Sequence, residues 1–443
     1  MTLPLLGAAV VLAAFLLFFL VKNNRCCWSP AAERRLRLPP GPWRLPLVGS
    51  LHHVLLSRHG DLPHRALREL AGRYGALMLL RFGAVPTLVV SSAEAAREVL
   101  KTHDACFASR HMTPTLAVFT RGGRDILFSP YGDLWRQLRR ICVLELFSAR
   151  RVQSLRHVRE DEAARLVRAV AEYGALRETE QCNRRVRAIM DDIIRERAAG
   201  KDDGDGEDDL LGVLLRLQKN GGVQCPLTTD MIATVIMEIF SAGSETASTT
   251  LEWAISELVR NPKVMDKAQS EVRKLFEGQD NLTEDDMSRL SYLHLVIRET
   301  LRLHAPAPFL LPRECREQCN VMGYDITEGT RVLVNAWAIA RDTRYWEDPE
   351  IFKPERFNAN LVDFKGNDFE YIPFGSGRRV CPGITLGLTS MELVLASLLY
   401  HFDWELPGGK RCEEIDMSEA FGITVRRKSK LVLHATPRVP CLH

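Results

Sequence analysis

The feature that most constrains this fold is a glycine-rich loop with one cysteine, Phe374–Gly383, directly before a long apolar helix pattern. Gly377 and Gly383 let the backbone turn tightly and approach a flat ligand, and Pro382 suits the first turn of the helix. Cys381 would face the unpaired N–H groups and the positive end of the helix dipole, which favours a thiolate. The loop therefore predicts either a sulfur ligand or a nucleophilic thiol.

The surroundings of Cys381 bear on that choice. A nucleophilic cysteine usually needs a histidine base nearby, and no histidine lies between His304 and His401. Arg379 supplies a fixed cation two residues away that suits an anionic cofactor edge. The rest of the 11 cysteines are scattered without a CxxC pair, which indicates free thiols in a reducing compartment rather than a disulfide scaffold or a zinc site.

Composition excludes several classes of protein. The net charge is only +3, so we expect no nucleic-acid partner. The 29 glycines and 22 prolines are too few for a low-complexity chain. With 443 residues, of which 46% are hydrophobic, the chain can bury a sizeable core. Length alone would suggest about three domains.

A membrane anchor is expected at the N-terminus, residues 1–21. Thr2–Val21 carries no charge, and about 20 residues of helix span roughly 30 Å, the thickness of a bilayer core. A cleaved signal peptide is the alternative, but no basic residue precedes the run and Lys22–Arg25 follows it. The basic, proline-rich linker 22–50 then places the domain 51–443 in the cytoplasm.

The periodicity of the chain predicts a mainly α fold with a minor β-sheet. Short strands are expected at Leu77–Phe82 and Pro86–Val90 and within Asn320–Val334, and an acidic surface loop at Lys201–Asp209. The ranges with a helical pattern are Ala93–Lys101, Asp133–Leu146, Arg151–Glu172, Arg184–Ala199, Thr229–Arg260, Pro262–Glu277, Tyr292–Leu303 and Ile384–Phe402.

The pattern Phe374-x-x-Gly377-x-Arg379-x-Cys381-x-Gly383 resembles the haem-binding signature of the cytochrome P450 family. The resemblance implies the P450 fold around haem b, with Cys381 as the axial ligand of the iron.

Upstream motifs extend the resemblance. Glu299 and Arg302 are three positions apart, so they share one helical face and can pair. By itself this is also the pattern of an ordinary surface ion pair. The resemblance implies that Arg356, in Pro354-Glu355-Arg356-Phe357, joins them as a structural unit behind the haem.

The haem propionates would need buried cations. The resemblance assigns Trp135 and Arg139, one helical turn apart, to that role, together with Arg313 and Arg379. Trp-x-x-x-Arg alone is more often surface packing.

An oxygen site is implied in the long helix Thr229–Arg260. Gly243 weakens the helix, and the Thr246 hydroxyl can bond back to the carbonyl of Ala242. A kink without chemistry is the alternative. The resemblance implies that Thr246 holds water and O2 and that Glu245 relays protons. The substrate wall would include Phe119, Ala242, Phe309 and Ile423.

The residues of these motifs resemble those of the plant microsomal group of the family. It implies a monooxygenase that inserts one oxygen atom from O2 into a small apolar specialised metabolite of terpenoid or phenylpropanoid type. The chain has no flavin or nicotinamide fingerprint, so electrons would come from NADPH through NADPH–cytochrome P450 reductase. The expected location is the endoplasmic reticulum membrane, with a single span and a cytoplasmic catalytic domain.

One interval departs from the family pattern. Trp135 and Thr246 are 111 positions apart, several dozen fewer than in the family. Between Glu172 and Cys182 one bundle helix and the two helices that roof the substrate pocket are expected to be missing. Two functions remain open: a monooxygenase with an open distal side, or a non-catalytic haem-protein from a defective gene model, splice form or pseudogene.

Overall fold

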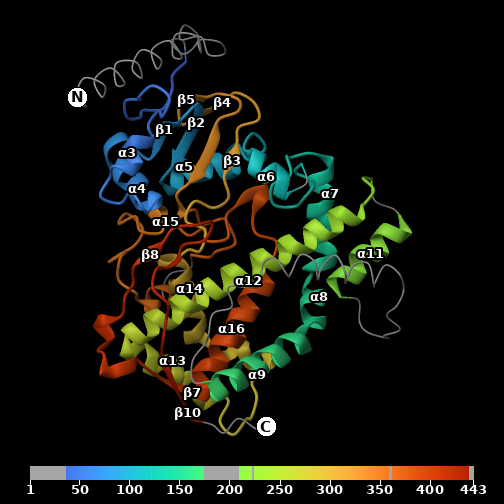
Figure 1. Ribbon diagram of the computed structural model, residues 1–443, viewed down its shortest axis with the longest axis vertical. Coiled ribbons are helices and arrows are strands. Elements are labelled where there is room, and N and C mark those ends of the chain that lie inside the picture. Colours follow the sequence, from blue (N-terminus) through green and yellow to red (C-terminus); the bar gives the residue numbers. More distant parts are fainter. Residues whose placement is uncertain (1–35, 121, 174–208, 222–223, 359–361, 439–443) are drawn as a thin grey trace, which may run out of the picture.

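The computed structural model describes residues 36–120, 122–173, 209–221, 224–358 and 362–438. Within these ranges helices predominate, with a small sheet at one end of the molecule (Figure 1). The predicted anchor, the first part of the linker, the helix expected at Arg184–Ala199 and residues 201–208 of the acidic loop lie outside the described residues.

The main sheet has four strands in the order β1-β2-β6-β3. Strands β1 (Leu77–Phe82) and β2 (Val85–Val90) form the predicted hairpin, which turns at Gly83 with a φ of 61°. β2 then pairs in parallel with β6 (Arg331–Val334), and β6 pairs antiparallel with β3 (Arg313–Glu314). The predicted strand region after Asn320 divides, because β4 (Cys319–Val321) and β5 (Tyr324–Ile326) form a separate hairpin around Gly323.

The helical part is built around α12 (Thr229–Arg260), which has the predicted bounds. The Thr228 hydroxyl accepts a hydrogen bond from the Met231 N–H and caps its start, while Pro262 begins α13 (Pro262–Leu275) directly after its end. α9 (Arg156–Tyr173), α14 (Ser291–Leu303) and α16 (Ile384–His401) pack with the C-terminal half of α12 around one large apolar core. Figure 1 shows α12 crossing the molecule between α7 and α14.

Several predicted helices are interrupted. The range Asp133–Leu146 is α7 (Asp133–Ile141) followed by a π-helical turn, and Ala93–Lys101 is α5 (Ala93–Arg97) followed by another. The range Arg151–Glu172 breaks at Leu155 between α8 (Ala149–Ser154) and α9.

Elements that the periodicity did not indicate complete the fold. They are α3 (Leu51–Leu55), α4 (Pro63–Tyr74), α6 (Pro114–Phe119), α11 (Leu210–Asn220), α15 (Ala336–Ile339), β7 (Phe402–Glu405), β8 (Glu419–Ala420), β9 (Arg426–Arg427) and β10 (His434–Pro437).

Candidate haem and oxygen site

The Cys381 loop is held in one conformation by its own backbone. The Cys381 N–H donates to the Phe374 carbonyl at 2.9 Å. Gly377 has a φ of +70°, and a Cβ there would lie 2.2 Å from the carbonyl oxygen of Leu100, so only glycine fits. Gly383 has an ordinary φ of −95°, and an added Cβ would meet nothing within 4 Å. The loop therefore leaves open space directly beside Cys381.

The Cys381 thiol differs from the sequence prediction in its electrostatics. Burial raises its pKa, against the lowering effects of the Gly383 N–H and of the Arg139 charge. Desolvation of the thiolate thus outweighs the helix N-terminus that the sequence argument invoked. A bound metal cation would reverse this balance, because it supplies the missing positive charge to the sulfur.

Buried arginines converge near the same loop. Arg313 donates to the Ser376 carbonyl at 2.8 Å, and Arg379 donates to the Ala108 carbonyl at 2.7 Å and stacks on Trp135, 4.2 Å from its ring. Burial lowers the pKa of Arg313 to about 10, and burial with the charge of Arg313 lowers that of Arg379 to about 9.

Two further arginines act on this group. Burial lowers the pKa of Arg139. Arg110, which the sequence argument missed, donates to the Leu127 carbonyl at 3.0 Å, and burial together with Arg379 and Arg313 holds its pKa well below the usual range.

The charges of this arginine cluster are only partly compensated. The carboxylates that act on Arg379 are Asp125 and Asp104, but burial raises the pKa of Asp125, and Asp104 also pairs with Arg378. Buried negative charges from a ligand would stabilise the guanidinium groups, and haem carries two propionates. The thiol, the open space at Gly383 and the arginine cluster therefore fit haem. The Trp135 indole N–H already donates to the Ile126 carbonyl at 3.1 Å, so Trp135 meets the cluster through its ring.

Glu299 and Arg302 form a fully buried ion pair with bonds of 2.8 Å, so they are not a surface pair. Arg356 donates to the same carboxylate at 2.9 Å, as does the Lys353 N–H. Arg302 also donates to the carbonyls of Ala340 and Pro349.

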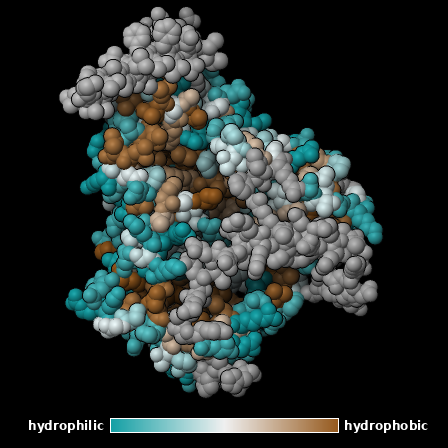
Figure 2. All heavy atoms as spheres, in the orientation of Figure 1, coloured by the Kyte–Doolittle hydropathy of each residue, from teal (hydrophilic) through white to brown (hydrophobic). Residues whose placement is uncertain are grey.

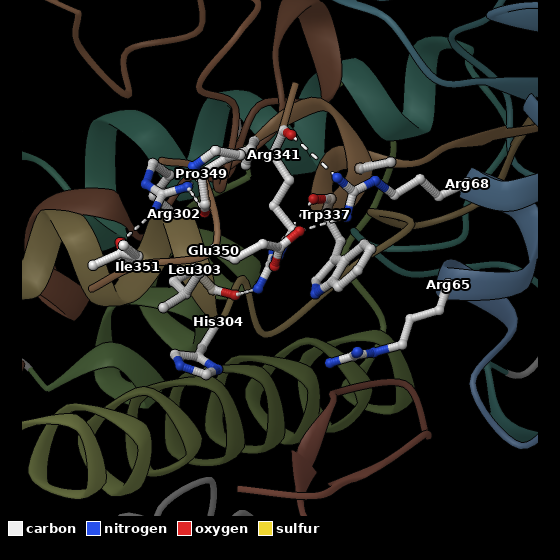
Figure 3. A network of polar contacts seen from close by, with 12 residues as sticks. Arg65, Arg68, Arg302, Leu303, His304, Trp337, Arg341, Pro349, Glu350 and Ile351 are labelled. Atoms are coloured by element: carbon white, nitrogen blue, oxygen red, sulfur yellow. Dashed lines mark hydrogen bonds and ion pairs between the residues drawn. The ribbon is translucent and has the colours of Figure 1, made fainter. Parts of the chain in front are cut away.

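The neighbouring Arg341 contacts the Leu303 carbonyl and Glu350, which also pairs with Arg68 (Figure 3). These bonds tie the end of α14 to the segment 340–356. That segment leads into the Cys381 loop.

The middle of α12 carries the acid–threonine pair. The Thr246 hydroxyl donates to the Ala242 carbonyl at 2.6 Å, the back-bond that the spacing predicted. The Glu245 carboxylate accepts a hydrogen bond of 2.6 Å from Thr424, a buried residue 179 positions away. Phe240–Glu245 is exposed although the C-terminal half of the helix is buried, so this stretch borders open space.

The expected substrate-wall residues are only partly brought together. Phe309 is buried, with its ring 5.9 Å from that of Phe421, and Ala242 is exposed on α12. Ile423 is 75% exposed, and the loop that carries it is bonded to α12 through Thr424. Phe119 ends α6, and its side chain is outside the described set.

Comparison with known proteins agrees with this geometry. A model of the family described as Cytochrome P450 matches residues 39–175 and 173–433. The chain is 45% identical to dolabradiene monooxygenase of Zea mays, over 91% of this chain and 93% of that protein. It is 44% identical to desmethyl-deoxy-podophyllotoxin synthase of Sinopodophyllum hexandrum, over 98% and 96%. It is 43% identical to premnaspirodiene oxygenase of Hyoscyamus muticus, over 93% and 95%.

The same comparisons locate an internal gap. The alignment with dolabradiene monooxygenase covers 474 positions but uses 91% of the 443 residues, about 403, which leaves about 71 positions without a counterpart. The two family matches meet at residues 173–175, where the sequence predicted missing helices.

A solved structure shows the same fold. A zebra fish cytochrome P450 with abiraterone superposes with a TM-score of 0.73 at 27% identity, over 85% of this chain and 100% of that chain. The chain belongs to the cytochrome P450 family and is a P450 monooxygenase.

Proposed function

We propose that this protein inserts one oxygen atom from O2 into a small apolar specialised metabolite of terpenoid or phenylpropanoid type, with electrons from NADPH–cytochrome P450 reductase. The observation that carries this proposal is the pair Glu245-Thr246 on α12: Glu245 is exposed and held by Thr424, and Thr246 is half-buried and bonded back into the helix. P450 proteins bind haem, which supplies O2 activation when bound.

The residues of the chain have separate roles in this reaction. Cys381 would be the sulfur ligand of the iron, and the arginine cluster would bind the propionates. The Thr246 hydroxyl would position water beside O2. The Glu245 carboxylate would accept and return the proton, because its Oε1 is fixed by a hydroxyl that can itself donate.

The substrate class rests on the relatives and on the wall residues. Dolabradiene monooxygenase and premnaspirodiene oxygenase are named for dienes, which are apolar. Phe309 and Ala242 offer apolar surface of the kind that binds such molecules.

A location on the endoplasmic reticulum membrane, facing the cytoplasm, is part of the proposal. Large apolar side chains are exposed before and along α3, and Figure 2 shows apolar atoms gathered over this part of the molecule. They are Trp43, Leu45, Leu47, Val48, Leu55 and Leu56. We call them the N-terminal apolar patch. Such patches are typical of interaction with a membrane or a partner. The apolar helix α16 is long enough to span a bilayer, but half of its window is buried in the protein core.

The non-catalytic alternative gains no support from the described residues. The Cys381 N–H, Arg313 and Thr246 each make the hydrogen bond described above despite the internal gap, which supports the catalytic proposal. The relatives that align over most of the chain are named as enzymes.

Three measurements test the proposal. The protein in microsomes with reductase and NADPH should reach the ferrous carbon monoxide state without dithionite, and no reduction by NADPH would contradict the electron route. With ¹⁸O2 and diene hydrocarbons, one labelled oxygen should enter the product. The Thr246→Ala variant should consume NADPH with little product; unchanged coupling would remove Thr246 from the oxygen role.

A further inference from the structure

A second group of metal-binding side chains lies outside the haem site. His103 and Cys106 follow the π-helical turn Glu98–Thr102, and Cys319 begins β4. The His103 ring nitrogen and the two Sγ atoms all lie within 4.8 Å of one another, and each residue is partly exposed. The two segments are joined at this point because the Arg316 N–H donates to the Cys106 carbonyl at 2.9 Å.

These ligands and their spacing suit zinc. Thiolate and imidazole bind Zn²⁺ at about 2.3 Å and about 2.1 Å, and a tetrahedron of that size separates its ligand atoms by roughly 3.5–3.8 Å. Side-chain shifts of about 1 Å would close the observed group around an ion. Glu317 is a nearby oxygen donor, since its Oε1 lies 3.5 Å from the Cys106 Sγ.

The groups around the thiols suit a cation. Cys106 lies beside the Glu317 carboxylate, and thiolates and carboxylates are negative, so a dication would stabilise them together.

A disulfide is the competing state of the same residues. The Sγ atoms of Cys315 and Cys319 are 4.0 Å apart, about twice the length of an S–S bond. A reducing cytosol disfavours that bond.

We propose that His103, Cys106 and Cys319 bind a zinc ion. The site would fix the loop that carries Asp104. The Asp104 carboxylate lies 3.3 Å from Arg313 and accepts the Arg378 N–H at 3.0 Å, so this loop contacts the Cys381 loop directly. Bound zinc would therefore slow haem loss by bracing the Cys381 loop.

The test measures zinc in the purified, haem-loaded full chain after gel filtration with buffered Zn²⁺. We expect one zinc per chain by mass spectrometry of the metal, and little in the double variant Cys106→Ser/Cys319→Ser. The variant Cys225→Ser changes a partly exposed thiol whose backbone is bonded to Gln137, and it should retain the zinc. Haem content and the carbon monoxide spectrum of each variant show that it is folded.

The rate of haem loss is a second test of the proposal. Haem transfer to an acceptor protein should be faster in the double variant than in the wild type and the Cys225→Ser protein. The proposal is overturned if wild type and double variant hold equal zinc, or if the wild type holds none. It is also overturned if protein alkylated during lysis contains a Cys315–Cys319 disulfide in place of the metal.

Discussion

Glu245 is held from outside its own helix. Its carboxylate accepts the Thr424 hydroxyl at 2.6 Å, and the next residue of that loop, Val425, accepts the Trp253 indole N–H at 3.0 Å. Two bonds thus tie residues 424–425 to α12. The orientation of the proposed proton carrier depends on a residue that no local motif identifies.

Removing the hydroxyl of Thr424 should therefore reduce coupling. In Thr424→Val we expect product per NADPH to fall by about tenfold, roughly 1.4 kcal/mol, the size of one hydrogen bond. Thr424→Ser keeps the hydroxyl and should restore coupling. Peroxide release and product formation, measured together, give the coupling. Equal coupling in wild type, Thr424→Val and Thr424→Ser would contradict the role of the Thr424 hydroxyl.

Glu238 gives a pH-dependent stability. Burial, then the Asp125 carboxyl, raises its pKa from the ordinary 4.5 to about 8. The folded chain therefore keeps a proton that the unfolded chain releases, so the free energy of unfolding falls as the pH rises from 4.5 to about 8.

In the variant Glu238→Gln the free energy of unfolding should fall much less over this pH range, because a glutamine side chain does not titrate. Denaturant unfolding of the haem-loaded protein at about pH 5 and about pH 8 measures it. Glu277→Gln, at an exposed site, serves as the control. A decline of the same slope in Glu238→Gln and wild type would be evidence against the assignment.

At this scale the sequence predicted local geometry well and distant contacts poorly. The Thr246 back-bond and the Glu299–Arg302 pair follow from helical spacing. Arg110 and the bond from Thr424 to Glu245 depend on segments brought together only by folding. The raised pKa of Cys381 was missed because burial cannot be read from the dipole argument.

At the scale of elements, the loop before α16 requires glycine for two separate reasons. Gly377 and Gly278 both have positive φ, but a Cβ at Gly278 meets nothing within 4 Å, whereas one at Gly377 meets the Leu100 carbonyl at 2.2 Å. The two positions separate backbone strain from steric clash.

Gly278→Ala should cost about 1 kcal/mol of stability, the price of strain alone, and keep normal haem content. Gly377→Ala should lose most of its haem, because the loop must also move away from Leu100. Thermal unfolding and haem-to-protein ratio measure both effects. Equal behaviour of the two variants would show that the clash is relieved without cost.

Helices with strong boundaries were predictable. α12 has a threonine cap and a following proline, and its bounds match. The π-helical turns after α5 and α7 were not predicted, because a change from i−4 to i−5 bonding leaves the apolar pattern nearly unchanged. α15 has only four residues, too few for periodicity to show.

At the scale of the molecule, the N-terminal apolar patch begins within the linker 22–50 and continues to the end of α3. A chain without residues 1–21 should still bind lipid vesicles. Because each large side chain contributes about 1.5–3 kcal/mol on burial, Trp43→Ser/Leu56→Ser should weaken binding by at least about tenfold. Val432→Ser, at another exposed apolar site, should not. Vesicle flotation distinguishes these outcomes, and equal binding by all forms would exclude the patch.

The internal gap is the main departure from the relatives, and the Cys381 loop and the arginine cluster lie outside it. The central claim is that Cys381 is the sulfur ligand of the haem iron. The most direct test is the ferrous carbon monoxide difference spectrum of wild type, Cys381→Ala and Cys225→Ser. We predict the red-shifted Soret band of thiolate ligation in wild type and Cys225→Ser, and its loss in Cys381→Ala. A wild-type protein without haem, or the same band in Cys381→Ala, would contradict the claim.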